Sequence, residues 1–366
     1  MARQEPRPLR RGWTTGACAA AAARAAFAAL LTGDFPDPVT IRLPRGQKPS
    51  FPLALSQMAE GRARAGVVKD AGDDPDVTHG ATIVAEVAWA EPGSGVTFAA
   101  GDGVGTVTRP GLQLGVGEPA INPAPRAMIR EALDELAEAN GAPPPDVTVT
   151  IAIPGGERFA EKTMNARLGI VGGLSVLGTT GIVVPYSCAS WVHSIHRGID
   201  VARAAGLDHI AAATGATSER AVQRLYALPD HALIDMGDFV GGTLKYLRSH
   251  PLPRLTLAGG FAKMAKFASG HLDLHSSKSA VDPAMLSEML AATGADHSTL
   301  TAARKGESAG AVLVAAGPWA PALADGIARR AREVALATLS GATAVEVAIV
   351  DRGGGFLARA GAEGLS

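Results

Sequence analysis

The second half of this 366-residue chain repeats one local pattern three times: a short apolar run, a glycine-containing turn and a helical segment. The apolar runs are Asp208–Ala213, Ala232–Met236 and Leu255–Ala258. The helical segments that follow them end at Leu225, Arg248 and Ala268, in the same order. Successive units of this kind predict a parallel, doubly wound α/β sheet. A helix over Ala324–Leu339 and a strand over Val345–Val350 would complete it.

The first half is typical of an α+β domain, because short apolar runs alternate with glycine and proline turns. A helix over Ala17–Leu31, capped by Thr14 or Thr15, opens it, and a second helix covers Arg126–Ala139. Strands are expected at Val39–Leu43, Ala65–Lys69, Ala81–Trp89, Val96–Ala99 and Val147–Ile153. The change of pattern near residue 187 predicts two domains, 1–187 and 188–366.

Charge and composition exclude several classes of partner. The net charge is −1 and aromatic residues make up 4%, so neither a basic field nor stacking platforms favour nucleic-acid binding. Two cysteines cannot build a disulfide scaffold, which indicates a reducing compartment, the cytoplasm. The arginine-rich N-terminus before Ala17–Leu31 superficially resembles a leader, but Arg24 interrupts this alanine-dominated run, so no membrane partner is expected.

Glycine is unusually frequent, at 44 residues. Two long irregular segments, 101–125 and 163–185, are rich in it, and long irregular segments within compact domains are often functional. A bias of the whole proteome towards alanine and glycine is the other explanation, and composition alone does not separate the two.

The glycine turns of the second domain favour a nucleoside-type ligand. In an open parallel sheet, ligands bind at the carboxyl ends of the strands, where the turn Thr214, Gly215, Ala216 and Thr217 falls. Asp235 lies 20 residues beyond Gly215, a common spacing for an acid that binds a ribose hydroxyl, with Asp238 its near competitor. The turn lacks the G-x-G-x-x-G pattern, so a capped helix and an acid that closes a turn remain the alternative.

The third turn, Gly259, Gly260 and the residues up to Lys263, is not a Walker motif, which disfavours an ATPase. Lys263 suits a ligand carboxylate or a solvated face. Farther on, His271, Asp273 and His275 alternate at metal-like spacing without a further ligand nearby, so no metal is expected and His275 is a candidate for proton transfer.

Other reactive groups have two interpretations each. Cys18, at a helix start, is either a thiol with a lowered pKa or a small packing residue among alanines. Asp102, between two glycines, suits a general base or a structural turn.

No G-x-S-x-G elbow supports a hydrolase. Arg10, Arg11, Arg109 and Arg126 flank the loops of the first domain and suit a ligand with several carboxylates.

Four long blocks of the sequence resemble the CbiD family, cobalt-precorrin-5B C1-methyltransferases of corrin-ring biosynthesis. They are LRRGWTTGACAAAAARAA (9–26), GDGVGTVTRPGLQLGVGEPAINPAPRAMI (101–129), LGIVGGLSVLGTTGIVVPYS (168–187) and GGFAKMAKFASGHLDLHSSKSAVD (259–282). The blocks follow in order through nearly the whole chain. One position departs, since Leu274 stands where the family pattern suggests threonine.

The resemblance implies an α+β domain with a mixed sheet, followed by a Rossmann-like domain similar to a reduced S-adenosylmethionine methyltransferase fold. It also implies methyl transfer from S-adenosylmethionine to a tetrapyrrole that brings its own cobalt. The donor would bind at Thr214, Gly215, Ala216, Thr217, Asp235, Asp238, Gly259, Gly260 and Lys263. The tetrapyrrole would bind at Arg10, Arg11, Thr14, Thr15, Gly16, Arg109, Thr179, Thr180 and Gly181, with Asp102 and His275 as candidate catalytic residues.

Two other functions stay open on the sequence. A non-catalytic carrier that hands a tetrapyrrole intermediate to the next enzyme would have the same glycine-rich cleft, although Asp235 favours the enzyme. A dehydrogenase is disfavoured by the missing second glycine of the first turn. A homo-oligomer is compatible with the sequence.

Overall fold

The computed structural model describes residues 8–306 and 308–361. The chain divides into two compact units, residues 1–187 (the first unit) and 188–366 (the second unit). Each unit has its own sheet and its own hydrophobic core.

The first unit is built on a five-stranded mixed sheet. Its strands, in spatial order, are β4 (Leu55–Ala59), β5 (Arg62–Val68), β6 (Thr82–Trp89), β9 (Val147–Ala152) and β7 (Val96–Ala100). Neighbours are antiparallel except β7 and β9, which run parallel. The mixed sheet implied by the resemblance is therefore confirmed.

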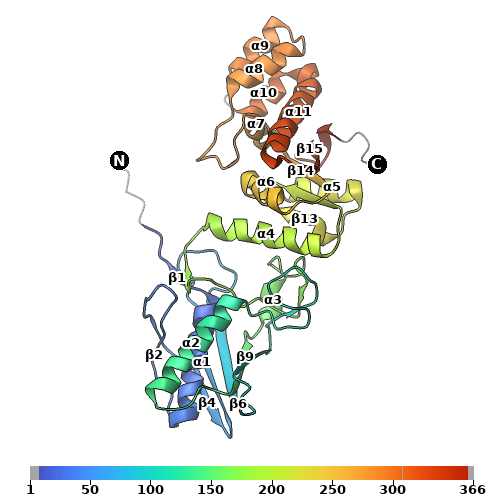
Figure 1. The fold of residues 1–366 in the computed structure, drawn as a ribbon. Helices are drawn as coiled ribbons and strands as arrows, with labels where there is room; N and C mark the ends of the chain where they lie inside the picture. Colours follow the sequence, from blue (N-terminus) through green and yellow to red (C-terminus); the bar gives the residue numbers. More distant parts are fainter. Residues whose placement is uncertain (1–7, 307, 362–366) are drawn as a thin grey trace, which may run out of the picture. The chain divides into compact units, whose positions relative to one another are not determined.

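Helices α1 (Thr15–Thr32) and α2 (Pro123–Ala139) lie side by side on this sheet (Figure 1). Thr14 caps α1 by accepting a hydrogen bond from the Ala17 N–H, and Gly33 ends the helix in the left-handed region. Alanine side chains are small, so α1 approaches β5, β6 and α2 closely, and Ala19–Ala23 are fully buried. Of the described helices, α1 alone is long and apolar enough to cross a membrane, and most of it is covered by protein.

Short strand pairs and close glycine contacts shape the rest of the first unit. The pairs are β1 (Gly12–Trp13) with β11 (Ile182–Val183), β2 (Val39–Thr40) with β3 (Ser50–Phe51), and β8 (Thr106–Val107) with β10 (Ile170–Val171). Helix α3 is Gly156–Ala160. A side chain at Gly156 or Gly173 would meet the Gly103 carbonyl oxygen at 2.2 or 2.3 Å. These glycines bring backbone against backbone.

The second unit contains the parallel sheet. Its strands, in spatial order, are β13 (Leu233–Asp235), β12 (His209–Ala213), β14 (Arg254–Gly260), β15 (Ala344–Val350) and β16 (Phe356–Ala360). The first four run parallel, and β16 returns antiparallel to β15.

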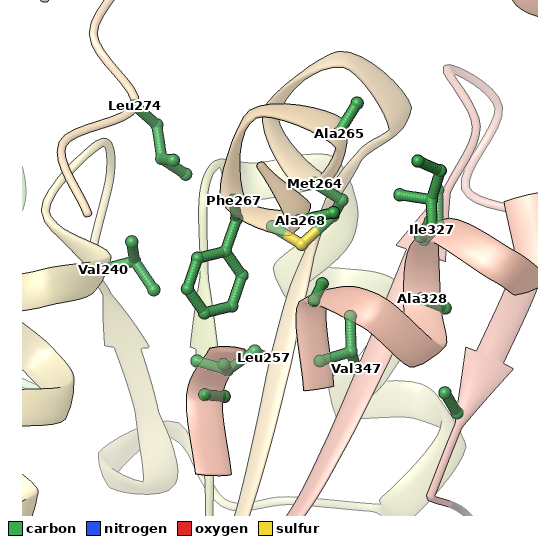
Figure 2. Packing of buried hydrophobic residues seen from close by; sticks show 14 of the residues in the cluster. Val240, Leu257, Met264, Ala265, Phe267, Ala268, Leu274, Ile327, Ala328 and Val347 are labelled. Atoms are coloured by element: carbon green, nitrogen blue, oxygen red, sulfur yellow. The ribbon is translucent and has the colours of Figure 1, made fainter. Parts of the chain in front are cut away.

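Helices cover both faces of this sheet. The helices of the unit are α4 (Cys188–Ala204), α5 (Ala216–Tyr226), α6 (Val240–Ser249), α7 (Phe261–Ala268), α8 (Pro283–Ala292), α9 (His297–Arg304), α10 (Ala309–Ala315) and α11 (Ala320–Leu339), with short 3-10 turns at Asp230–Ala232 and Gly317–Trp319. Helix α5 packs on one face through Val222, over the alanines of a small cluster. The other face carries the large core, where Figure 2 shows Phe267 and Met264 of α7 near Leu257 and Val347.

Most strands and helices lie within a few residues of their predicted positions. The strand expected over Val39–Leu43 is wrong beyond Thr40, because the Ile41 and Leu43 N–H groups donate to the loop oxygens of Pro49 and Gln47. Leu274 is 1% exposed and belongs to the large core, so leucine at this position serves packing.

Candidate functional site

A cleft of about 250 Å³ opens at the carboxyl edge of the parallel sheet. The chain leaves β12 through α5 on one face of the sheet and leaves β14 through α7 on the other face. The space between the ends of β12 and β14 is therefore the topological switch point of the sheet. The lining residues are Thr214, Gly215, Ala216, Thr217, Ser218, Gly260, Val350, Asp351 and Arg352. The cleft thus lies where open α/β sheets bind their ligands.

Glycine keeps the cleft open. No atom lies within 4 Å of where a side chain would begin at Gly215 or at Gly260. A side chain at Gly259 would instead meet the Met264 methyl group at 2.5 Å, so that glycine serves packing. Gly215 is also the N-cap of α5 and makes no side-chain capping bond, and the first residues of α5, Ala216 to Ser218, line the cleft.

The acids predicted for the ribose lie at the neighbouring strand end. Asp235 is the last residue of β13, opposite Ala213 of β12, and its carbonyl oxygen accepts a hydrogen bond from Trp191 Nε1 at 3.1 Å. Asp238 Oδ1 is 2.9 Å from Lys263 Nζ, which also donates to the Thr214 carbonyl oxygen at 3.3 Å. The Lys263 charge is therefore balanced by Asp238, and Asp235, Asp238 and Lys263 are not among the residues that line the cleft.

His275 lies on an exposed loop next to the Asp238 turn. The Leu274 N–H donates to the Asp238 carbonyl oxygen at 2.9 Å, and His275 Nδ1 lies 2.8 Å from Ser277 Oγ. Nδ1 also accepts from the Ser277 N–H at 3.2 Å, so Nε2 carries the hydrogen when the ring is neutral. Within residues 8–306 and 308–361, no three His, Cys, Asp or Glu side chains gather as a metal site would require.

In the first unit, four of the residues predicted for the tetrapyrrole, Arg10, Thr14, Thr15 and Gly16, make contacts that hold the N-terminal loop in place. The Arg10 guanidinium donates to both oxygens of Asp70. Thr14 caps α1 and its N–H donates to the Gly181 carbonyl oxygen, while the Thr15 hydroxyl accepts from Lys69 Nζ at 3.2 Å. Lys69 is 2% exposed and paired with Asp76. Gly16 packs against Pro125.

Acid should loosen the Arg10–Asp70 contact. The Arg10 guanidinium, with the Gly72 N–H as a further donor, lowers the pKa of Asp70 from 3.8 to about 2. Asp70 therefore stabilises the folded state fully above pH 4, and this stabilisation is lost as the pH falls towards 2. Urea titrations from pH 5 to pH 2 should show Asp70→Asn below wild type at pH 5, with the gap closing in acid. The effect is small because Asp70 is half-exposed.

Asp34→Asn is the control for that titration, since it removes one surface carboxylate that makes no described hydrogen bond. An equal gap between Asp70→Asn and wild type at every pH would contradict the expected linkage.

Two of the four predicted arginines remain available to a ligand. Arg126 donates to the Ile121 and Pro119 carbonyl oxygens and pairs with Glu118 at 2.8 Å, and Arg10 is held by Asp70. Arg11 is exposed, and Arg109 lies half-buried along Gly169. Within the described residues, neither of their guanidinium groups forms an ion pair.

Among the other predicted positions, Asp102 and Thr179 are exposed, Thr180 is half-buried and bonded to Ile182, and Gly181 is buried.

Comparison with known proteins decides the family. The CbiD family matches residues 2–185, and the CbiD C-terminal domain matches residues 273–361. The chain belongs to the CbiD family. A relative from Brucella anthropi, named cobalt-precorrin-5B C(1)-methyltransferase, is 57% identical over 97% of both chains. A Bradyrhizobium protein of the same name is 60% identical over 96% of this chain and 94% of its own length.

Among solved structures, this CbiD chain is similar to a cobalamin biosynthesis protein, CbiD, from Archaeoglobus fulgidus. The two share 29% identity, with 69% of this chain and 77% of that one covered, at a TM-score of 0.39.

Cys18 of this CbiD chain is a packing residue. Burial raises the pKa of its thiol to about 12, and it is fully buried among the alanines of α1. The interpretation of Cys18 as a thiol with a lowered pKa is therefore wrong, because the helix N-terminus does not offset the loss of water.

The sequence reasoning missed one wall of the cleft. Val350, Asp351 and Arg352 line it from the end of β15, just before Gly353, Gly354 and Gly355. The available signal was the glycine triplet after an apolar run, which marks a tight turn at a strand end.

Proposed function

We propose that this chain transfers a methyl group from S-adenosylmethionine to C1 of cobalt-precorrin-5B, giving cobalt-precorrin-6A in cobalamin biosynthesis. Membership of the CbiD family and the names of relatives at 57–60% identity support the reaction. The structural observation that carries it is the glycine-walled cleft at the switch point of the second unit.

The second unit would act as a Rossmann-like donor-binding domain. The open space beside Gly215 and Gly260 admits a ligand close to the backbone, and Asp235 at the adjacent strand end suits the ribose hydroxyls. Bound S-adenosylmethionine would supply an electrophilic methyl group on a positively charged sulfur. The residues of the chain then have to hold the donor so that sulfur, methyl and ring carbon align.

The first unit would bind the tetrapyrrole. The acetate and propionate groups of such a ring need cationic and N–H donors, and Arg11 and Arg109 carry guanidinium groups without an ion pair in the described part of the chain. Cobalt belongs to the substrate and needs no ligand from the protein. Asp102, exposed between its two glycines, remains the candidate for proton removal. His275, whose Nδ1 accepts from the Ser277 N–H, presents the protonated Nε2 of the neutral ring and remains a candidate for proton transfer as a donor.

The deciding experiment measures methyl incorporation. Purified full-length protein, labelled S-adenosylmethionine and cobalt-precorrin-5B should yield a product labelled at C1. Binding of both ligands without transfer would overturn the enzyme and leave the tetrapyrrole carrier.

Asp235→Ala should weaken binding of S-adenosylhomocysteine, the unreactive product, by about 1–3 kcal/mol if Asp235 holds the ribose. Calorimetric titration measures the dissociation constant, and thermal unfolding checks that the variant is folded. Asp208→Ala is the matched control, because Asp208 precedes β12 at the opposite edge of the same sheet. An unchanged dissociation constant for Asp235→Ala would reject the ribose assignment.

A further inference from the structure

The turn between β15 and β16 forms a rigid wall of the cleft. Asp351 Oδ1 accepts hydrogen bonds from the Gly353 and Gly355 N–H groups, both at 2.8 Å. The Asp351 N–H donates to the Gly355 carbonyl oxygen at 2.8 Å, which closes the turn. The carboxylate of Asp351 is thus used inside its own turn and faces two N–H donors. These bonds fix the backbone on both sides of Arg352.

Arg352 brings to the cleft a positively charged side chain for which no ion pair is described. It is exposed and lines the cavity, and in the described part of the chain its side chain makes no hydrogen bond or ion pair. Lys263, the cation that the sequence predicts for a carboxylate, is paired with Asp238 at 2.9 Å. Of these two cations, only Arg352 lines the cleft, and among the described residues its guanidinium group forms no ion pair, whereas Asp351 beside it is bonded within its own turn.

The order of groups along the sheet edge matches the donor. Asp235 ends β13, the Thr214–Gly215 turn follows β12, Gly260 ends β14 and Arg352 follows β15. Strands lie about 4.8 Å apart, so this series extends over roughly 14 Å. S-adenosylmethionine has its ribose hydroxyls and its amino-acid carboxylate on opposite sides of the sulfur. With the ribose at Asp235, the carboxylate end lies towards β14 and β15.

We infer that Arg352 binds the amino-acid carboxylate of the methyl donor, a role that rests on the function proposed above. The guanidinium fork pairs with a carboxylate through two parallel hydrogen bonds. Ala216, Thr217 and Ser218, the first residues of α5, line the same cleft, and the first N–H groups of a helix are donors that suit an anionic group. Arg352 therefore distinguishes a nucleoside that carries an amino acid from one that does not.

The test compares two ligands that differ in the amino-acid moiety. The dissociation constants of S-adenosylhomocysteine and 5′-methylthioadenosine are measured by calorimetry for full-length wild type, Arg352→Ala, Arg352→Lys and Arg220→Ala. Arg220 is exposed on α5 outside the cleft lining, so its removal controls for the loss of one nearby positive charge. Arg352→Ala should weaken S-adenosylhomocysteine about 10- to 100-fold and leave methylthioadenosine unchanged, with Arg352→Lys in between and Arg220→Ala near wild type.

Equal S-adenosylhomocysteine binding by wild type and Arg352→Ala would overturn the inference and leave the proposed function standing. An equal loss for both ligands would also overturn it, because the variant would then have damaged the cleft as a whole. Wild-type protein that binds neither S-adenosylhomocysteine nor S-adenosylmethionine would refute the proposed donor site, and the role of Arg352 with it.

Discussion

Gly260→Leu is expected to slow methyl transfer about 100-fold or more, because the new side chain occupies the space that the donor needs. Gly260 lines the cleft, and no atom lies within 4 Å of the position its side chain would take. Its backbone angles, φ −71° and ψ 155°, suit any residue, so the substitution introduces no backbone strain. The variant should fold normally and bind S-adenosylhomocysteine weakly.

Gly341→Leu is the matched control for this substitution. Gly341 also has open surroundings, with only the Leu339 carbonyl oxygen at 3.8 Å, and it precedes β15 at the opposite edge of the sheet. Its rate and its affinity for S-adenosylhomocysteine should equal those of wild type. A normal rate and affinity in Gly260→Leu would show that the cleft does not hold the donor.

The architecture of the second unit could be predicted because its signals are local. Each strand of Leu233–Asp235 and Arg254–Gly260 is a short apolar run that ends in a turn and a helix, and parallel pairing follows from that order. Antiparallel β16 lacked such a signal, since Phe356–Ala360 includes Arg359 and is only partly buried. Strand β4 was missed for a related reason: it is an edge strand whose residues are mostly exposed, without apolar alternation.

Helix α4 (Cys188–Ala204) and helices α8, α9 and α10 were also missing from the sequence prediction. Pro283–Ala292, His297–Arg304 and Ala309–Ala315 are short, and they are inserted between α7 and α11. Short helices depend on tertiary packing more than on their own propensity, so a single sequence carries little information about them. Their caps, such as Asp282 and Asp296, become recognisable once the helix ends are known.

The sequence predicts which turns form the site. It does not predict which residues pair with the charged groups of the site. The turn at Thr214–Thr217 and Gly260 lie in the cleft lining, as the strand order suggests. Pairing of Lys263 with Asp238, or of Arg10 with Asp70, joins residues 25 or more apart in the chain, and no spacing rule indicates it. The turn of Arg352 connects two strands, whereas the glycine turns that indicate a ligand in the sequence each open a helix, so the sequence alone did not predict its place in the cleft.

The glycines serve two purposes that composition could not separate. Gly103, Gly156 and Gly173 bring backbone segments of the first unit into contact, which is a structural use. Gly215 and Gly260 keep open a cleft whose volume a side chain would reduce. Substitution at the first group should therefore affect folding, whereas substitution at the second affects binding.

Arg359→Met should destabilise the second unit by about 3–5 kcal/mol, because it leaves a buried carboxylate without its cation. Glu346 on β15 is completely buried. Its Oε1 accepts from Arg359 Nε at 2.7 Å, and its Oε2 accepts from the hydroxyl groups of Tyr226 at 2.7 Å and Thr256 at 2.9 Å. Methionine keeps much of the aliphatic length of arginine, so the stability lost in this variant reports mainly the removal of the guanidinium charge.

Hydrogen exchange of the β14 and β15 amides measures this effect, because those amides report the unfolding of the second unit without assuming that both units unfold together. Arg329→Met is the control: its i,i+4 pair with Asp325 is exposed, and such pairs contribute about 0.5 kcal/mol or less. The double variant Arg359→Met with Glu346→Gln should recover most of the lost stability, since the neutral amide still accepts from Tyr226 and Thr256. A double variant as unstable as Arg359→Met alone would mean that packing around Arg359, and not the isolated charge, stabilises this face of the sheet.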